Sequence, residues 1–396
     1  MPAVTFLRKL LDCSCQSIHA GRLSALMSGV TGLLAGHRLS IAGLGRALKS
    51  SARVKHNIKR MDRLAGNAHL HAERLPIYQA LARGLLGTRP QPVMVVDWSD
   101  ARSDRALQLL RASVVVDGRS HTLYEEIHPL SKYDNRRVRQ QFLERLGTCL
   151  PVGCRPILIT DAGFRVSWVQ QVEAMGWAWL GRVRGRSHYR LNDNARWQPI
   201  RALYSEARVK PQFLGTAELT QHHPHRCQLY LVRQRKQGRQ DKTIYGRAAQ
   251  GTSSRACARR HTEPWLLATS LKGVAATRIC KLYRQRSQIE GTFRDLKCAQ
   301  WGLHLRAHRT RCPQRLAVLV LIGTLAAFVA WLTGLAGTTL ALEREHQANT
   351  VTQRRVLSFV YLGLQLLWHA DARITYDRIR QAFSRLKAII ADNAYA

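Results

Sequence analysis

Residues 316–342 contain no charged side chain, and this segment of 27 apolar and small polar residues restricts what the chain can fold into. A helix of about 20 apolar residues is long enough to cross a bilayer. The same sequence also suits a helix that is buried on all sides in a large domain. The remainder of the chain must therefore supply either membrane-anchoring features or a core that surrounds this helix.

The net charge narrows the class of partner. Lys and Arg number 62 against 25 Asp and Glu, a formal net charge of +37. An enzyme that acts on small molecules in the cytosol does not need such a positive field. Binding to a polyanion does benefit from it, because each phosphate that the protein neutralises releases counterions. Nucleic acid fits this charge, and an anionic membrane is the competing partner. The apolar fraction of 45% argues against disorder, and 396 residues allow one large domain or two to three ordinary ones.

The nine cysteines follow no zinc or disulfide pattern. Cys13 and Cys15 form one close pair and Cys149 and Cys154 another, but neither pair is followed by the second half of a zinc site. We expect reduced thiols in a reducing cytoplasm. The first twelve residues have no long apolar core and no signal-peptide cleavage pattern.

Two apolar runs each end in an aspartate. Residues 93–98 and 156–164 predict buried central strands, with Asp97 and Asp161 at their ends. The alternative for Asp97 is a turn residue that merely ends its strand. Asp117-Gly118 is a strong hairpin signal. The full predicted order is strand 93–98, hairpin strands 107–116 and 119–127, helix 135–147, strand 156–164, helix 165–175 and strand 177–183.

This order of elements is typical of the ribonuclease-H topology. In that topology the sheet is mixed and its first and fourth strands are neighbours. Asp97 and Asp161 would then lie side by side at the carboxyl ends of central strands, where open α/β sheets place their sites.

Residues 275–301 predict a helix that carries a third acid. On a helical wheel Tyr283, Arg286, Glu290 and Lys297 fall within an arc of roughly 60°. A neighbouring apolar stripe would pack on a core, and Asp295 lies roughly 140° round from Glu290. The alternative is an amphipathic surface helix with ion pairs four residues apart. The apolar stripe consists of Leu282, Ile289, Phe293 and Leu296.

The spacing Tyr-x2-Arg-x3-Glu-x6-Lys resembles the signature of DDE-type transposases of the IS4 family, and the text RQRSQIEGTFRDLK resembles the IS10-like branch. The resemblance spans residues from about 50 to 340. It implies a ribonuclease-H-like α/β core, a mixed sheet with flanking helices, interrupted by a β-rich insertion and joined to helical N- and C-terminal parts. It also implies that the apolar segment 316–342 is a buried helix of a soluble protein.

The implied activity is cut-and-paste DNA transposition, with hydrolysis of a first strand, a hairpin intermediate and joining to target DNA. Three carboxylates, Asp97, Asp161 and Glu290, would be the catalytic residues and the ligands of two Mg²⁺ ions, with Asp97 bridging and Mn²⁺ as a possible substitute. Such hard cations prefer oxygen ligands.

Other residues are expected to hold DNA. Arg286 and Lys297 would bind phosphates and Tyr283 would donate its hydroxyl to one. Trp265 is a candidate for stacking on an unpaired base, with a buried core tryptophan as the alternative. The segment 55–64 resembles the part of the IS10 group that lies on the transposon end, and a solvated basic helix is the alternative. Its candidate DNA contacts are Lys55, Lys59, Arg60 and Arg63.

The predicted division of the chain has five parts. Residues 1–88 form a helical DNA-binding domain, in which residues 40–46 start a helix that closely approaches another. A basic stretch within the insertion, residues 233–260, would be either a tether or a DNA-facing loop. The other parts are the core segments 93–184 and 263–342, the insertion 185–262, and a helical region 343–396 that is a candidate for dimerisation.

We expect a bacterial, cytoplasmic protein that associates with the nucleoid, binds terminal inverted repeats and target DNA, forms a homodimer in the synaptic complex and does not enter membranes. Three rival interpretations remain. They are a related metal-dependent nuclease without strand transfer, a non-catalytic DNA-binding protein with a decayed site, and a basic membrane protein built on residues 316–342.

Overall fold

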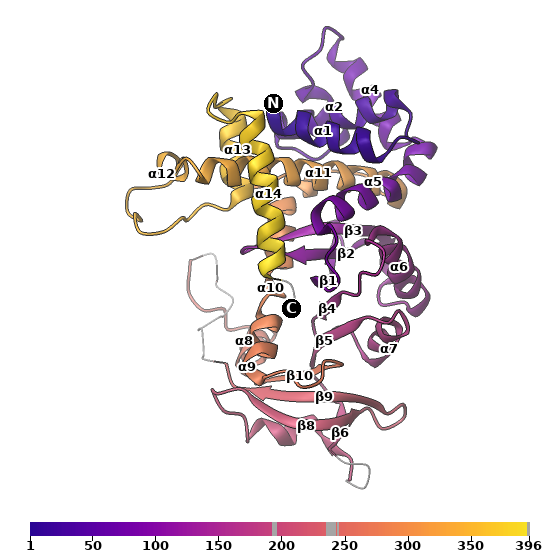
Figure 1. Ribbon diagram of the computed structural model, residues 1–396, viewed down its shortest axis with the longest axis vertical. Helices are drawn as coiled ribbons and strands as arrows, with labels where there is room; N and C mark the ends of the chain where they lie inside the picture. Colours follow the sequence, from indigo (N-terminus) through magenta and orange to yellow (C-terminus); the bar gives the residue numbers. More distant parts are fainter. Residues whose placement is uncertain (192–195, 235–242, 244, 394–396) are drawn as a thin grey trace. The chain divides into compact units, whose positions relative to one another are not determined.

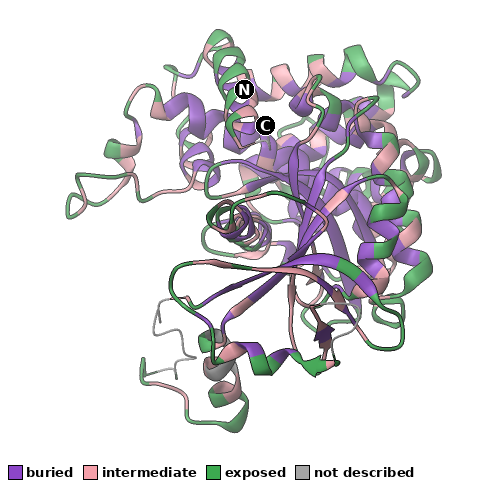
Figure 2. Cartoon of the chain, turned by 60° about the horizontal axis from the view of Figure 1, so that its bottom comes forward, coloured by how far each residue is buried: buried purple, intermediate pink, exposed green. Residues whose placement is uncertain are grey.

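The computed structural model describes residues 1–191, 196–234, 243 and 245–393. The chain divides into two units, one of Met1–Pro156 with Ser287–Ala396 and one of Ile157–Arg286. Helices and strands both contribute extensively, so the fold is mixed α/β as expected. Figure 2 shows that the strands are largely buried, whereas the outer faces of the helices are exposed.

The first unit begins with helices that pack closely. The Ser40 hydroxyl accepts a hydrogen bond from the Gly43 N–H at 3.1 Å and so caps the third helix. A Cβ added to Gly45 would lie 2.5 Å from the Ile58 Cα, which confirms the predicted close approach between two helices. The helices are α1 (Pro2–Ser14), α2 (Ala20–Gly36), α3 (Ile41–Ala47), α4 (Val54–Ala65) and α5 (Ala68–Leu86).

An antiparallel sheet follows in this unit, in the order β3-β2-β1. The predicted strand and hairpin are confirmed, and Gly118 takes the positive φ of 68° that the turn requires. The Asn135 side chain caps the predicted basic helix by accepting from two backbone N–H groups. The elements are β1 (Val93–Asp100), β2 (Leu107–Val115), β3 (Ser120–Pro129), η1 (Leu130–Lys132) and α6 (Arg136–Cys149).

The carboxyl-terminal part of this unit is built around α11 (Pro313–Thr338). Among the described helices, α11 is long and apolar enough to cross a membrane by length and composition alone, yet 94% of its apolar window is buried inside the protein. It packs against α2, α13, α14 and β3, and Figure 1 shows α14 crossing it. The burial agrees with the expectation of a core helix. Its neighbours in sequence are α10 (Ser287–Lys297), η3 (Leu305–Ala307), α12 (Glu343–His346), α13 (Phe359–Trp368) and α14 (Tyr376–Asp392).

Two glycines allow α11 and α13 to cross at very short range. A Cβ on Gly334 would overlap the Phe359 carbonyl, and a Cβ on Gly363 would overlap the Ala330 carbonyl. Any larger residue at either position would force the two helices apart.

The second unit contains a mixed sheet in the order β4-β5-β10-β9-β8-β6-β7. Among the strand pairs that the structure describes in this unit, β4 and β5 are parallel and the others are antiparallel. Its elements are β4 (Ile157–Thr160), α7 (Val166–Ala174), β5 (Ala178–Val183), β6 (His188–Arg190), β7 (Gln198–Pro199), η2 (Ile200–Tyr204), β8 (Gln212–Leu219), β9 (His225–Val232), α8 (Thr252–Thr262), β10 (Trp265–Thr269) and α9 (Ala276–Arg284).

The described part of residues 185–262 contains β6, β7, β8 and β9, and these strands extend the sheet through the pairing of β9 with β10. The basic stretch 233–260 is only partly described, because residues 235–242 and 244 lie outside the described residues. Its last part is helical, since α8 begins at Thr252.

The predicted single helix over residues 275–301 is wrong. The structure has two helices, α9 and α10, separated by a turn at Gln285 and Arg286. The Gln285 and Arg286 N–H groups bond to the carbonyls of Leu282 and Tyr283, three residues back, which tightens and ends α9. Tyr283 and Arg286 therefore do not share one helix with Glu290 and Lys297.

Candidate active site

Asp97 lies where β1 passes from the core toward the surface. Met94, Val95 and Val96 are fully buried, and the strand becomes half-buried from Asp97 onward. One Asp97 carboxylate oxygen accepts the N–H of Trp98 at 2.8 Å. This bond orients the carboxylate at the point where the strand emerges from the core.

A buried ion pair shares the sheet face with Asp97. Asp97 is the antiparallel partner of Arg111, so both side chains point to the same face. Arg111 is bound to Glu125, and its guanidinium lies 5.0 Å from the centre of the Phe293 ring on α10. The same Glu125 accepts hydrogen bonds from Tyr78 and Thr324. The face that carries Asp97 is therefore the face on which α10 packs.

Lys297 connects α10 to β1 on that face. Its Nζ donates to the Ser99 hydroxyl at 2.6 Å. Burial lowers the pKa of Lys297 to about 8, and the charges of Asp100 and Asp97 partly oppose that shift. Lys297 is thus a half-buried cation within electrostatic reach of Asp97.

Glu290 stands exposed in the first turn of α10, on the same side of the helix as Lys297. Seven residues separate them, which is close to two full turns. Ile289, Phe293 and Leu296 are buried, as the predicted apolar stripe requires. The structure therefore places Glu290 and Lys297 on one side of α10, the helix that packs on the sheet face of Asp97.

Asp161 belongs to the second unit and immediately follows β4. One of its carboxylate oxygens accepts the Gly163 N–H at 2.8 Å. The side chain is half-buried at the carboxyl end of a strand whose four residues are all buried. Asp161 and Asp97 are thus each oriented by a backbone N–H. Asp161 follows its strand as predicted, whereas Asp97 lies within β1, which continues to Asp100, so the predicted position of Asp97 at the strand end is wrong.

Tyr283 is buried among charged groups of the second unit. It is 4% exposed, and burial raises its pKa to about 12. Asp161 raises this pKa further, whereas Arg286, Arg182 and Arg184 lower it. The hydroxyl therefore lies within electrostatic reach of the predicted second carboxylate and of three arginines.

Trp265 is the first residue of β10 and is half-buried. Its ring meets the Tyr283 ring edge to face, with centroids 5.0 Å apart and an interplanar angle of 77°. The two predicted DNA-binding residues Trp265 and Tyr283 are therefore in direct contact.

Two arginines of this cluster, Arg182 and Arg184, were not predicted from the sequence. The parallel register pairs Thr160 with Gly181, which places Arg182 level with Asp161. Arg182 donates to the backbone carbonyls of Glu263 and Pro264, and Arg184 forms an ion pair with Glu263 at 2.8 Å. The signal was present in the text RVRGR at the end of the predicted strand 177–183.

The candidate DNA contacts of the first unit lie on α4. Lys55, Lys59, Arg60 and Arg63 are all exposed. Asn57, Met61, Leu64 and Ala65 form the buried face. Arg60 donates to the Ser28 hydroxyl, and Lys59 lies 3.6 Å from Asp62. The helix thus presents a basic face and keeps its apolar residues inside.

The donor chemistry of the three carboxylates fits a hard divalent cation. Asp97, Asp161 and Glu290 offer only oxygen atoms, which Mg²⁺ and Mn²⁺ accept as ligands. Within the described residues no three His, Cys, Asp or Glu side chains are grouped so that they could hold a metal ion. The fit therefore depends on the kind of donor and on the anchored orientation of the two aspartates.

A family model described as the transposase DDE domain matches residues 88–329. This range is more than half of the chain and contains Asp97, Asp161 and the whole of α10. The chain belongs to the DDE transposase family. Membership indicates an enzyme that cleaves DNA and transfers strands, with DNA as its partner and divalent metals as the usual cofactors of the family. No curated protein matches the chain.

Proposed function

We propose that this transposase belongs to the IS4 family, in its IS10-like branch, and moves an insertion sequence by cut and paste. The observation that carries the proposal is the family match, which includes every residue of the Tyr283, Arg286, Glu290 and Lys297 signature. The net charge of +37 supports a polyanionic partner along much of the chain.

The proposed architecture follows from the same resemblance. A ribonuclease-H-like core comprises residues 93–184 and 263–342, with residues 185–262 as a β-rich insertion. Residues 1–88 bind the transposon end, and residues 343–396 contribute to a homodimer in the synaptic complex. A location in the cytoplasm at the nucleoid follows from this activity.

Asp97, Asp161 and Glu290 are the proposed ligands of two Mg²⁺ ions, for which Mn²⁺ can substitute. When bound, such ions lower the pKa of a ligated water and stabilise the leaving oxygen of a phosphodiester. The bonds from the Trp98 and Gly163 N–H groups hold the two aspartates in fixed orientations. This anchoring reduces the entropy that the carboxylates lose on ligation.

The surrounding cations and rings hold the DNA strand. Arg286 and Lys297 bind phosphate oxygens, and Lys297 is already oriented by Ser99. The Tyr283 hydroxyl, near three arginines, donates to a phosphate. Trp265 supplies a ring for an unpaired base, and Tyr283 supports that ring from its edge. On α4, Lys55, Lys59, Arg60 and Arg63 contact the transposon end.

The proposed reaction has four steps. Water attacks the phosphorus at the end of the element, and the 3′ oxygen leaves and takes up a proton. The freed 3′-hydroxyl attacks the phosphodiester at the element's end on the opposite strand and forms a hairpin, and the 3′ oxygen of the flanking DNA leaves and takes up the proton. Water reopens the hairpin. The 3′-hydroxyl then attacks target DNA, so one phosphodiester forms as another breaks.

The test uses a plasmid that carries the reading frame with its flanking DNA as substrate. Wild-type protein with Mg²⁺ should excise the element and join it to a second plasmid. Glu290→Ala should abolish cleavage and retain binding of the flanking DNA in a mobility-shift assay, because it removes a ligand and no phosphate contact. Full cleavage by Glu290→Ala would refute the assignment. Cleavage without any joining by the wild type would favour a nuclease without strand transfer.

A further inference from the structure

Three polar residues line the side of α10 that faces away from Glu290. Gln288, Thr292 and Asp295 are spaced four and three residues apart, so they form one stripe on the helix. At 100° per residue that stripe lies roughly opposite Glu290 and Lys297. Each of the three residues bonds to the hairpin of β2 and β3, and we call these contacts the α10 clamp.

The strongest contact of the clamp joins Asp295 to Arg119. Arg119 Nε donates to one carboxylate oxygen at 2.6 Å and Nη2 donates to the other at 3.1 Å. Asp295 is 8% exposed, and burial raises its pKa despite the lowering effect of Arg119. A half-buried ion pair of this kind is weak evidence for a stabilising role, because desolvation offsets much of the attraction. The pair does, however, fix a direction through two parallel bonds.

Two further contacts fix the helix along its length. The Thr292 hydroxyl accepts the Ser120 N–H at 3.0 Å and donates to the Ser120 carbonyl at 2.9 Å. One turn earlier, Gln288 Oε1 accepts the Val116 N–H at 2.8 Å. Together with Asp295, these bonds cover almost the whole of α10.

Gly291 lets Arg119 lie across the helix. A Cβ at position 291 would be 2.9 Å from Arg119 Cδ and Nη1. Since Arg119 is held by Asp295, it cannot move aside without breaking the ion pair. The glycine that interrupts the helical sequence is therefore a fitted part of the clamp.

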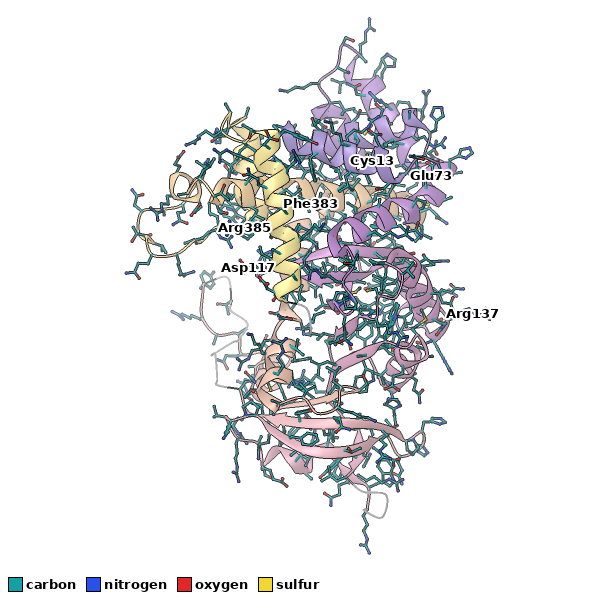
Figure 3. The ribbon with its side chains drawn as sticks, in the orientation of Figure 1. Cys13, Glu73, Asp117, Arg137, Phe383 and Arg385 are labelled. Atoms are coloured by element: carbon teal, nitrogen blue, oxygen red, sulfur yellow. The ribbon has the colours of Figure 1, made fainter. Side chains whose placement is uncertain are left out.

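The hairpin that carries the clamp is itself anchored. Asn393, at the end of α14, donates to the Val116 carbonyl at 2.7 Å, and Arg355 lies 3.7 Å from Asp117. Figure 3 labels Asp117 in this turn, beside the end of α14. The α10 clamp thus rests on a fixed support.

The geometry gives the clamp a large effect on Glu290. Apolar contacts of Phe293 and Leu296 are non-directional and allow α10 to roll. A carboxylate about 5–6 Å from the helix axis moves by about 2 Å for a roll of about 20°. Metal ligands must stay within about 0.2 Å of their ideal distances. Rolling of α10 on this scale would therefore remove Glu290 from a metal.

We propose that Arg119, Gln288, Thr292 and Asp295 are positioning residues that set the rotation of α10 and so present Glu290 for metal binding. The inference rests on the proposed role of Glu290 as a ligand. Arg119 and Asp295 lie 176 residues apart in the sequence, and their contact affects metal affinity and not DNA binding.

The test compares Thr292→Val with Thr292→Ser. Valine has nearly the shape of threonine but cannot form the hydrogen bonds to Ser120, whereas serine retains the hydroxyl. Arg119→Met breaks the ion pair. Arg373→Met breaks an exposed pair with Glu345, 2.7 Å long, and serves as the control. Thermal unfolding verifies that each variant folds.

Two measurements are made on each variant with the full-length protein and the plasmid described above. One is the Mn²⁺ concentration that half-saturates cleavage, and the other is Mn²⁺ binding followed by electron paramagnetic resonance. Thr292→Val and Arg119→Met should raise the half-saturating Mn²⁺ concentration and the Mn²⁺ dissociation constant by about 10-fold or more. Loss of a partner that orients a metal ligand has an effect of this size. Thr292→Ser and Arg373→Met should retain the wild-type values, and DNA binding should be unchanged throughout.

Wild-type Mn²⁺ binding in both Thr292→Val and Arg119→Met would overturn the clamp while leaving the proposed function intact. Equal losses in Thr292→Ser and Thr292→Val would also overturn it, because the hydroxyl would then not matter. Unaltered cleavage by Glu290→Ala would instead refute the proposed function itself.

Discussion

The buried ion pair of Arg111 and Glu125, on the sheet face of Asp97, allows a test of how much mutual neutralisation contributes to the free energy of unfolding. The two residues are 1% and 2% exposed, and Arg111 Nε donates to Glu125 at 2.8 Å. Glu125 also accepts the hydroxyls of Tyr78 at 2.8 Å and Thr324 at 2.6 Å. The perturbation is a double-mutant cycle of Arg111→Met, Glu125→Leu and the combined variant.

Each single change should lower the free energy of unfolding by about 3–5 kcal/mol, because it leaves a buried charge without its partner. Glu125→Leu should cost more than this, since it also leaves two hydroxyls unpaired at about 1–3 kcal/mol each. In the combined variant no buried charge remains, and only the hydroxyl cost of about 2–6 kcal/mol persists. Adding Arg111→Met to Glu125→Leu should therefore restore stability.

Urea unfolding followed by circular dichroism measures this order directly. The expected midpoint concentrations rise from Glu125→Leu to the double variant, and the wild type is highest. A double variant that unfolds at or below the midpoint of Glu125→Leu would refute the reasoning. The pair would then contribute through independent packing of its two side chains rather than through mutual neutralisation.

Three further predictions concern single residues. The ammonium of Lys297, with a pKa lowered from 10.5 to about 8, is charged below that pH and neutral above it, so its contribution to DNA affinity should fall as pH rises through about 8. Binding titrations should show Lys297→Arg keeping that contribution to higher pH, and identical profiles would contradict this. Arg286→Ala should weaken end binding and strand transfer through loss of a phosphate contact, measured by mobility shift and joining assays. Unchanged values for both would count against that role. Gly45→Ala should lower the melting temperature by pushing Ile58 away, at a cost of about 1–3 kcal/mol, whereas Gly84→Ala, with only ordinary contacts, should not.

Local patterns in the sequence were sufficient for the elements that carry Asp97 and Asp161. In each strand an apolar run is followed by the acid, although β1 continues past Asp97 to Asp100, and the hairpin turn at Asp117 and Gly118 has residues typical of a turn. These features are encoded by neighbouring residues and by burial alone. The cap at Ser40 was predictable for the same reason.

The break between α9 and α10 was not predictable in this way. Gln285 and Arg286 are good helix formers, and the segment contains no proline. The turn is produced by tertiary packing, which overrides local propensity. The placement of four signature residues on one helix face failed with it, although Glu290 and Lys297 still share α10.

Contacts between residues far apart in the sequence could not be predicted from local sequence patterns either. The wheel placed Asp295 away from Glu290, but its partner Arg119 is 176 residues distant. Arg111 likewise pairs with Glu125 across a strand register that depends on a β-bulge after Ala112. Such pairings become visible only when the register and the docking of α10 are known.

The core position of α11 has a consequence for how the chain is made. Its apolar surface is covered partly by α1, α2 and α5, which precede it, and partly by α13 and α14, which are synthesised after it. A chain interrupted after residue 345 would expose an apolar helix that is long enough to span a membrane. Truncated or frameshifted copies should therefore precipitate or enter lipid, so that damaged genes yield insoluble products rather than free DNA-binding fragments.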